Sequence, residues 1–146
     1  MKHKTSLTRL RQSGFTLIEI MVVVVIIGIL AGIVAPKIFG NVDKANITRA
    51  KQDIHGIEGA LDMYKLDNFD YPTTDQGLQA LVSNPGDVRN WRPGGYLKRL
   101  PQDPWGREYL YLNPGERGEV DIYTLGKDGQ VGGEESSADI GNWDLN

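Results

Sequence analysis

An unbroken apolar run near the start of the chain constrains the fold more than any other feature. Residues 15–35 read FTLIEIMVVVVIIGILAGIVA, and these 21 residues carry a single charge, Glu19. An α-helix rises about 1.5 Å per residue, so a helix of this length spans about 30 Å, the thickness of the hydrocarbon layer of a membrane. We therefore expect one membrane-spanning helix here, because a helix buried in a soluble core is usually shorter.

The charges around this run predict its orientation. Residues 1–14 contain four Lys or Arg residues and no Asp or Glu. Basic flanking residues stay on the cytoplasmic side of a membrane helix. We therefore expect a single membrane crossing, with the residues after Ala35 on the outer side, in the periplasm.

Composition excludes two classes of interaction. The chain has 16 basic and 19 acidic residues, and without the four bases of residues 1–14 the balance falls from −3 to −7. Proteins that bind a phosphate backbone present clustered Lys and Arg, so nucleic acid is not an expected partner. The chain has no cysteine, so neither a disulfide nor a thiolate metal site can stabilise the part that follows the apolar run.

Glu19 is the one anomaly inside the apolar run. An acid within a membrane span costs about 2.5–3.5 kcal/mol on insertion scales and usually marks a function. An ordinary secretory signal is the alternative interpretation, because small residues in AGIVAP could be cleaved after the run. Such a signal gives no reason for Glu19, so we expect the helix to be retained and its charge to be compensated.

The residues Gly14-Phe15-Thr16-Leu17-Ile18-Glu19 resemble the prepilin cleavage motif of type IV pilins and pseudopilins. The resemblance implies that a prepilin peptidase cuts between Gly14 and Phe15, removes residues 1–14 and methylates the new amine of Phe15. In a bundle of such helices, the amine of an incoming subunit can neutralise Glu19 of its neighbour, where an unpaired charge is costly. Phe15 and Glu19 would then set the axial register of assembly.

The helix is expected to continue beyond the membrane. Gly28, Gly32 and Pro36 interrupt the apolar run, and proline lacks the N–H that a helix needs, so a kink or local melting is expected over residues 32–36. Beyond it, apolar residues recur in steps of three and four, which predicts an amphipathic helix ending near Asp67. These residues are Ile47, Ala50, Ile54, Ile57, Leu61 and Tyr64.

The other face of this second helical stretch is charged. It carries Lys44, Arg49, Lys51, Asp53, Glu58 and Asp62. A solvated surface is one interpretation. The other follows from the resemblance, which suggests that Glu58 and Asp62 meet Arg49 and either Lys98 or Arg99 of neighbouring subunits.

Residues 69–146 change character and favour loops with a few short elements. Repeated Pro and Gly mark residues 69–104 as loops, with Thr74–Val82 as the expected short helix. Strands are expected at Tyr109–Leu112 and Val120–Thr124, separated by a turn at residues 113–115, with a third short strand near the end. The fold class is therefore α+β, a long N-terminal helix packed on a small antiparallel sheet.

Three further segments narrow the resemblance. They are LDMYKLDN running into YPTT at residues 61–74, PQDPWG at 101–106 and DIGNW at 139–143. All three are similar to the major pseudopilins of type II secretion systems, which share the type IV pilin-like fold. The resemblance implies a leader at 1–14, a transmembrane assembly helix at 15–35 and a periplasmic domain at 36–146.

The resemblance also implies a function. A major pseudopilin polymerises into a periplasmic helical fibre that drives export of folded proteins across the outer membrane. Its expected partners are other copies of itself, minor pseudopilins, the inner-membrane assembly platform and the prepilin peptidase. The alternative is a type IV pilin-like filament subunit for adhesion, motility or DNA uptake.

The glycine-rich segment LGKDGQVGGEESSADIGNWD at residues 125–144 is a candidate metal site. It carries five acids and one base, and oxygen ligands on a flexible loop are what calcium prefers. The spacing is not that of an EF-hand, so a solvated acidic loop is the alternative from the residues alone. The resemblance implies one bound calcium, which would stabilise a domain that lacks disulfides.

Carried over residue by residue, the resemblance gives a ligand set. Asp128 and Asp139 match side-chain ligands, and Leu125 and Gln130 match positions that offer backbone carbonyls. The insert GGEESS leaves open which of Glu135, Ser136 and Ser137 completes the shell, and we name Ser137 as the candidate. Catalysis would have to use the same acids, but a glycine-rich terminal loop does not enclose a carboxylate pair as acid–base chemistry requires. We therefore do not expect an enzyme.

Overall fold

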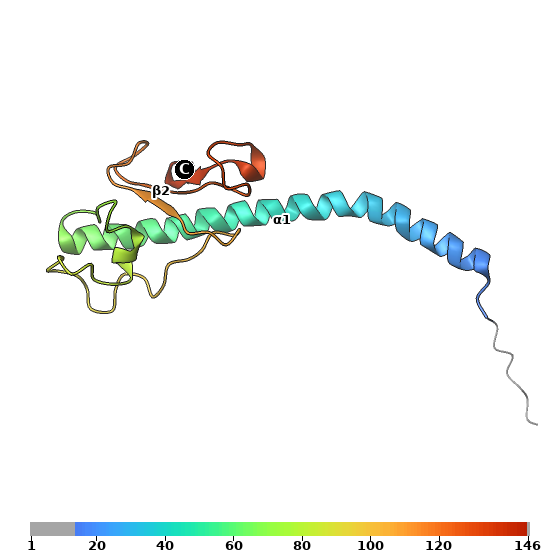
Figure 1. Cartoon of the computed structure of the whole chain (residues 1–146), viewed down its shortest axis with the longest axis horizontal. Helices are drawn as coiled ribbons and strands as arrows, with labels where there is room; N and C mark the ends of the chain where they lie inside the picture. The colour runs from blue at the N-terminus through green and yellow to red at the C-terminus, as the bar shows by residue number, and fades with distance from the viewer. Residues whose placement is uncertain (1–13, 146) are drawn as a thin grey trace, which may run out of the picture. The chain divides into compact units, whose positions relative to one another are not determined.

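The computed structural model describes residues 14–145, with the side chains of residues 35–39 left out of the description. Its contacts divide the chain into two compact units, Met1–Phe39 and Gly40–Asn146. One helix, α1, runs from Leu17 to Asn68 and therefore belongs to both units (Figure 1). The helical backbone is continuous through residues 32–36, so the local melting predicted there is not present in this structure.

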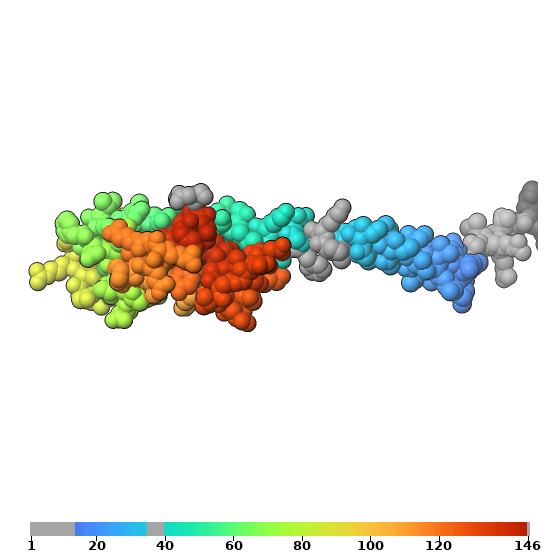
Figure 2. All heavy atoms as spheres, turned by 90° about the horizontal axis from the view of Figure 1, so that it is seen from above, coloured from blue at the N-terminus to red at the C-terminus, as the bar shows by residue number. Residues whose placement is uncertain are grey.

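The first unit consists of the apolar part of α1. Leu17–Val34 is long and apolar enough to cross a membrane, and none of it is buried. Figure 2 shows the atoms of this stretch in blue. An apolar surface of this length has no counterpart on ordinary soluble proteins, so it requires a lipid or protein environment.

In the second unit, α1 supplies one wall of the hydrophobic core. The predicted apolar face is confirmed, because Ala50, Ile54, Ile57, Leu61 and Tyr64 are buried and Ile47 packs against them. Burying one such aliphatic side chain contributes about 1.5–3 kcal/mol. The helix ends at Asn68, one residue beyond the predicted end, and is followed by Phe69 with φ 69°.

The remaining walls come from short elements on either side of α1 (Figure 1). Strands β1 (Leu110–Leu112), β2 (Asp121–Thr124) and β3 (Ile140–Gly141) form an antiparallel sheet in the order β1-β2-β3. The predicted helix at Thr74–Val82 is shorter than expected: residues 74–77 form a turn, and only η1 (Leu78–Leu81) is helical, as a 3-10 turn. Two more 3-10 turns, η2 (Glu135–Ser137) and η3 (Asn142–Asp144), flank β3.

A buried acid closes the hairpin between β1 and β2. Asp121 is 2% exposed, and its carboxylate accepts backbone N–H groups from Glu116, Arg117 and Gly118 at 2.7–3.3 Å. These bonds satisfy a charge that would otherwise be costly to bury. Asp121 therefore holds the turn at residues 113–118 against the start of β2.

Candidate assembly helix and metal-binding loop

Residues of the predicted cleavage motif form the start and the first turn of α1. Thr16 caps the helix, since its Oγ1 accepts the N–H of Glu19 at 3.2 Å and its carbonyl accepts the same group at 3.1 Å. A Thr followed three residues later by Glu is the sequence signature of a capping box, which the sequence reasoning missed. Glu19 also lies where the helix dipole favours a negative charge.

Phe15 and Glu19 are both solvent-accessible in the single chain. Phe15 is 79% exposed, and Glu19 forms no ion pair with another described residue. The position is therefore open to a partner, but cleavage between Gly14 and Phe15 and pairing with a neighbour both stay predictions. Residues 1–13 of the predicted leader lie outside the described residues.

The charged face of α1 makes only modest contacts within the chain. Arg49 Nε lies 3.7 Å from Asp53 Oδ2, and His55 Nδ1 lies 3.7 Å from Glu58 Oε2. The Tyr71 hydroxyl donates to Asp62 Oδ1 at 2.9 Å. Exposed ion pairs of this kind contribute about 0–1 kcal/mol, so these charges could exchange partners at little cost.

The structure brings two of the predicted assembly residues together. Arg49 and Arg99 line one cavity of about 530 Å³, together with Asp53. Tyr109 donates to Asp53 Oδ2 at 3.1 Å from the core side. A cavity with two guanidinium groups suits an acidic side chain, but whether Glu58 or Asp62 of a neighbour enters it stays a prediction.

The acidic loop at residues 125–139 folds back on itself. Asp128 is exposed, and its Oδ1 accepts the N–H of Gln130 at 3.1 Å. Asp139 is half-buried, and its Oδ2 accepts the N–H of Gly132 at 2.9 Å. The two predicted side-chain ligands are therefore each bonded to the 130–132 segment, from opposite ends of the loop.

One oxygen in this loop has no partner. Asp139 Oδ1 is buried, and no described residue donates a hydrogen bond to it. A buried acceptor left unsatisfied costs about 1–3 kcal/mol, and more for a charged group. A bound cation would satisfy this oxygen, so the loop fits a metal.

Backbone hydrogen bonds distinguish the remaining ligand candidates by whether their carbonyl oxygens already accept a hydrogen bond. The Ser136 carbonyl accepts the N–H of Lys127 at 2.8 Å. The hydrogen bonds outside the helices and strands of the described chain include none to the carbonyls of Leu125, Gln130 or Ser137. Three or more acidic, His or Cys side chains do not gather into a metal-binding group within residues 14–145. A site here would have to combine Asp128 and Asp139 with backbone carbonyls.

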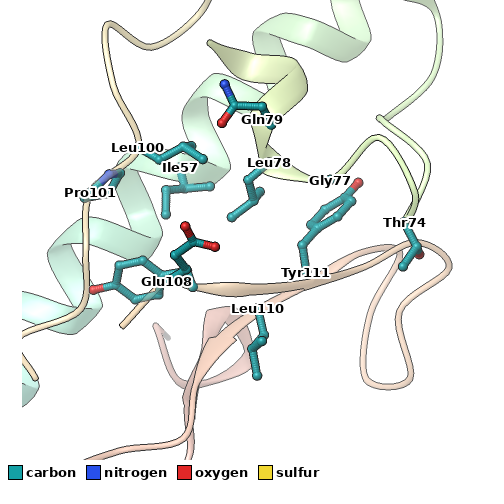
Figure 3. A pocket seen from close by; sticks show the side chains of 11 residues that line it. Ile57, Thr74, Gly77, Leu78, Gln79, Leu100, Pro101, Glu108, Leu110 and Tyr111 are labelled. Carbon is teal, nitrogen blue, oxygen red and sulfur yellow. The ribbon is translucent and has the colours of Figure 1, made fainter. Parts of the chain in front are cut away.

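A second hollow, of about 290 Å³, lies between α1, η1 and β1 (Figure 3). Its titratable lining residues are Glu108, Tyr109 and Tyr111. Burial, as the first cause, raises the pKa of both tyrosines, and Tyr111 donates its hydroxyl proton to the Pro72 carbonyl at 2.8 Å. Both hydroxyls are thus protonated at neutral pH and bonded as donors. Tyr109 donates to Asp53 and Tyr111 to Pro72, so neither hydroxyl donates to Glu108.

Two family models match adjacent parts of the chain. The model described as type II secretion system (T2SS), protein G, matches residues 37–143, and the model of the prokaryotic N-terminal methylation motif matches residues 9–35. The boundary between the two matches falls at Ala35 and Lys37, close to the division between the two structural units at Phe39.

Individual relatives cover nearly the full chain. It is 61% identical over 137 residues to the type II secretion system core protein G of Vibrio cholerae, covering 92% of this chain and 94% of the relative. It is 60% identical over 139 residues to the protein of the same name from Pseudomonas aeruginosa, covering 93% and 98%. It also resembles the crystal structure of the major pseudopilin from the type 2 secretion system of enterohaemorrhagic Escherichia coli. That match has a TM-score of 0.66 and 51% identity and covers 73% of this chain and 90% of that one.

Proposed function

The chain belongs to the family of type II secretion system core protein G, the major pseudopilins, and from this premise we propose how its residues build the fibre. Residues 15–35 anchor the newly made subunit in the inner membrane and then become the helix that packs in the core of the pseudopilus. The 36–146 domain lies in the periplasm and forms the outer layer. The fibre's growth drives folded proteins across the outer membrane.

The observation that carries this proposal is the capped, exposed start of an apolar helix. Leu17–Val34 is exposed throughout, and Glu19 stands in its first turn without an ion-pair partner in the described chain. After cleavage, the ammonium of Phe15 on an incoming subunit supplies the missing cation. Because an unpaired charge is expensive in a low dielectric, only the register that forms this pair is stable.

Two matched variants test this pairing in a strain that lacks its own core protein G. Glu19→Ala removes the charge, whereas Thr16→Ala removes the helix cap and keeps the charge. We expect Glu19→Ala to be cleaved and methylated normally but to give less than a tenth of the wild-type fibre and secreted enzyme. Thr16→Ala should keep most of both, since losing a cap costs only about 1 kcal/mol. Normal fibres from Glu19→Ala would refute the pairing.

The terminal loop is proposed to bind one calcium ion. Asp128 and Asp139 would be its side-chain ligands, and Leu125, Gln130 and Ser137 would offer carbonyl oxygens. The unpartnered Asp139 Oδ1 supports this assignment, as does the absence of cysteine from the chain. Calcium would lock the loop against β2 and β3, and its binding free energy would add to that of folding.

Thermal unfolding of the full-length processed chain in non-ionic detergent tests the calcium site. Wild type should melt at least about 10 °C higher in millimolar calcium than in excess chelator, since a shift of this size corresponds to a few kcal/mol for a domain of this length. Asp128→Ala and Asp139→Ala should each abolish the difference. Asp87→Ala, at an exposed acid outside the loop, is the control and should leave it unchanged. Equal melting of wild type with and without chelator would remove the calcium site from the proposal.

The remaining partners follow from the family and are part of the same proposal. The prepilin peptidase would process the Gly14–Phe15 bond, the inner-membrane platform would add subunits to the base, and minor pseudopilins would form a different part of the fibre. Deleting the gene and comparing enzyme secretion with surface piliation tests this assignment. Loss of piliation with intact secretion would favour a type IV pilin instead.

A further inference from the structure

One side chain outside the loop joins it to the domain core. Arg107 lies in the segment that leads into β1, and its guanidinium is half-buried. Nε donates to Asp103 Oδ2 at 3.3 Å, and Nη2 donates to the carbonyl of Gly126. Arg107 therefore bridges an acid of the core to the second residue of the 125–139 loop.

The Asp103 end of this bridge is fixed. Asp103 is 2% exposed and accepts the backbone N–H groups of Trp105 at 3.0 Å and Arg107 at 2.8 Å. Its second oxygen accepts the hydroxyl of Thr124, the last residue of β2, at 2.5 Å. A carboxylate held by this many donors cannot shift without losing several bonds. The guanidinium bonded to it is therefore held in one place relative to the sheet.

The loop end of the bridge touches both sides of the proposed cation site. Gly126 is buried with φ 61°, and a Cβ added to it would lie 2.5 Å from the Ala138 carbonyl oxygen and 2.7 Å from the Ser137 carbonyl carbon. The same guanidinium lies against Gly129, on the other side of Asp128. Fixing Gly126 and Gly129 thus fixes the backbone around Asp128 and the segment that leads from Ser137 into Asp139.

We propose that Arg107 is a positioning residue for cation binding by the 125–139 loop, an inference that rests on the proposed calcium site. Groups that orient ligands without touching the ion strengthen binding because the ligands lose less freedom when the ion arrives. The positive charge of Arg107 does not prevent a cation from binding nearby, because the guanidinium is paired with the carboxylate of Asp103. The planar guanidinium is needed because it donates to two acceptors at once, Asp103 and the Gly126 carbonyl. A lysine ammonium cannot reproduce this geometry.

Calcium titration calorimetry on the full-length chain in non-ionic detergent, with Arg107→Lys and Arg107→Gln, tests the inference. Arg89→Gln is the matched control, because Arg89 is exposed and lines a different cavity, beside Tyr64 and Asn68. Both Arg107 variants should bind calcium about 10–100-fold more weakly, the loss typical of groups that orient metal ligands. Arg89→Gln should bind as wild type does. Thermal unfolding in chelator verifies that each variant is folded before it is titrated.

The possible results distinguish a positioning role of Arg107 from an effect of its charge and from the absence of a calcium site. Wild-type affinity in both Arg107 variants would overturn the inference. Tighter binding by Arg107→Gln with unchanged binding by Arg107→Lys would also overturn it, because the guanidinium would then act as a competing cation. If wild type itself binds no calcium, the proposed site fails first and this inference falls with it.

Discussion

The two parts of α1 show how one secondary structure is stabilised in two ways. Leu17–Val34 is apolar apart from Glu19 in its first turn, and its side chains are exposed. In the 47–64 stretch apolar residues recur every three or four positions, and those residues are buried against the sheet and η1. The second part finds its apolar neighbours within the chain. The first must find them in lipid or in other subunits, which is what a subunit transferred from a membrane to a fibre requires.

The largest effect should separate these two parts directly. Leu61 is 1% exposed and Ile26 is 50% exposed. Leu61→Ala should lower the free energy of unfolding of the domain by about 2–5 kcal/mol, since it leaves a cavity in the core. Ile26→Ala should leave that free energy unchanged. Urea unfolding of the full-length chain in detergent, followed by tryptophan fluorescence, measures both. Equal losses would contradict the division into two units.

Removing a buried polar group should have the next largest effect on the free energy of unfolding of the domain. Asp121→Ala should cost about 2–3 kcal/mol, since three backbone N–H groups would lose their charged acceptor. Asp75→Ala is the control, because Asp75 is exposed in the turn before η1. The same unfolding measurement reports both variants. A small effect for Asp121→Ala would mean that water replaces its carboxylate in the turn.

Alkaline pH should weaken the domain through its tyrosines. Burial first, and then the hydrogen bond to Asp62, raises the pKa of Tyr71 from 10.0 to about 12. The unfolded chain loses this proton first as the pH rises, so the stabilisation is complete below pH 10 and is lost between pH 10 and 12. Tyr71→Phe should make the fall in stability across this window shallower. An unchanged pH profile would show that Tyr71 does not contribute to it.

The smallest effect is expected from the ion pair of Lys65 with Glu119, whose side chains are 36% and 67% exposed. Lys65→Met should change the free energy of unfolding by no more than about 1 kcal/mol, and the difference should shrink in high salt. A larger, salt-independent loss would show that the contact of Lys65 Nζ with the Tyr71 ring, 4.3 Å from its centroid, contributes more than the ion pair.

Sequence reasoning predicted the features that depend on periodicity or on local turn chemistry. The apolar spacing placed Ile54, Ile57 and Leu61 in the core, and β1 and β2 each begin one residue after the predicted start and end where predicted. The third strand was expected only as a short strand near the end, and β3 is that strand. The family resemblance is confirmed by the match over residues 37–143. The calcium ligands and the assembly contacts stay predictions, because they concern an ion and neighbouring subunits.

Features that depend on contacts between distant residues could not be predicted. Asp103 and Arg107 read as ordinary charges in a turn, and only the fold brings them to Thr124 and Gly126. The segment at 74–82 has helix-forming residues, but it tightens to a 3-10 turn where Leu78 and Leu81 pack into the core. The cap at Thr16 is different, because the spacing to Glu19 was a readable signal.

If Phe15 of one subunit meets Glu19 of the next, neighbouring helices are shifted by four residues. The chain has no cysteine, so tagged Ile18→Cys and untagged Val22→Cys subunits can be co-expressed and oxidised within assembled fibres. We expect a strong cross-link between positions 18 and 22 of different subunits and a weak one between two copies of position 18. A dominant 18–18 cross-link in intact fibres would contradict the four-residue shift and with it the pairing of Phe15 and Glu19.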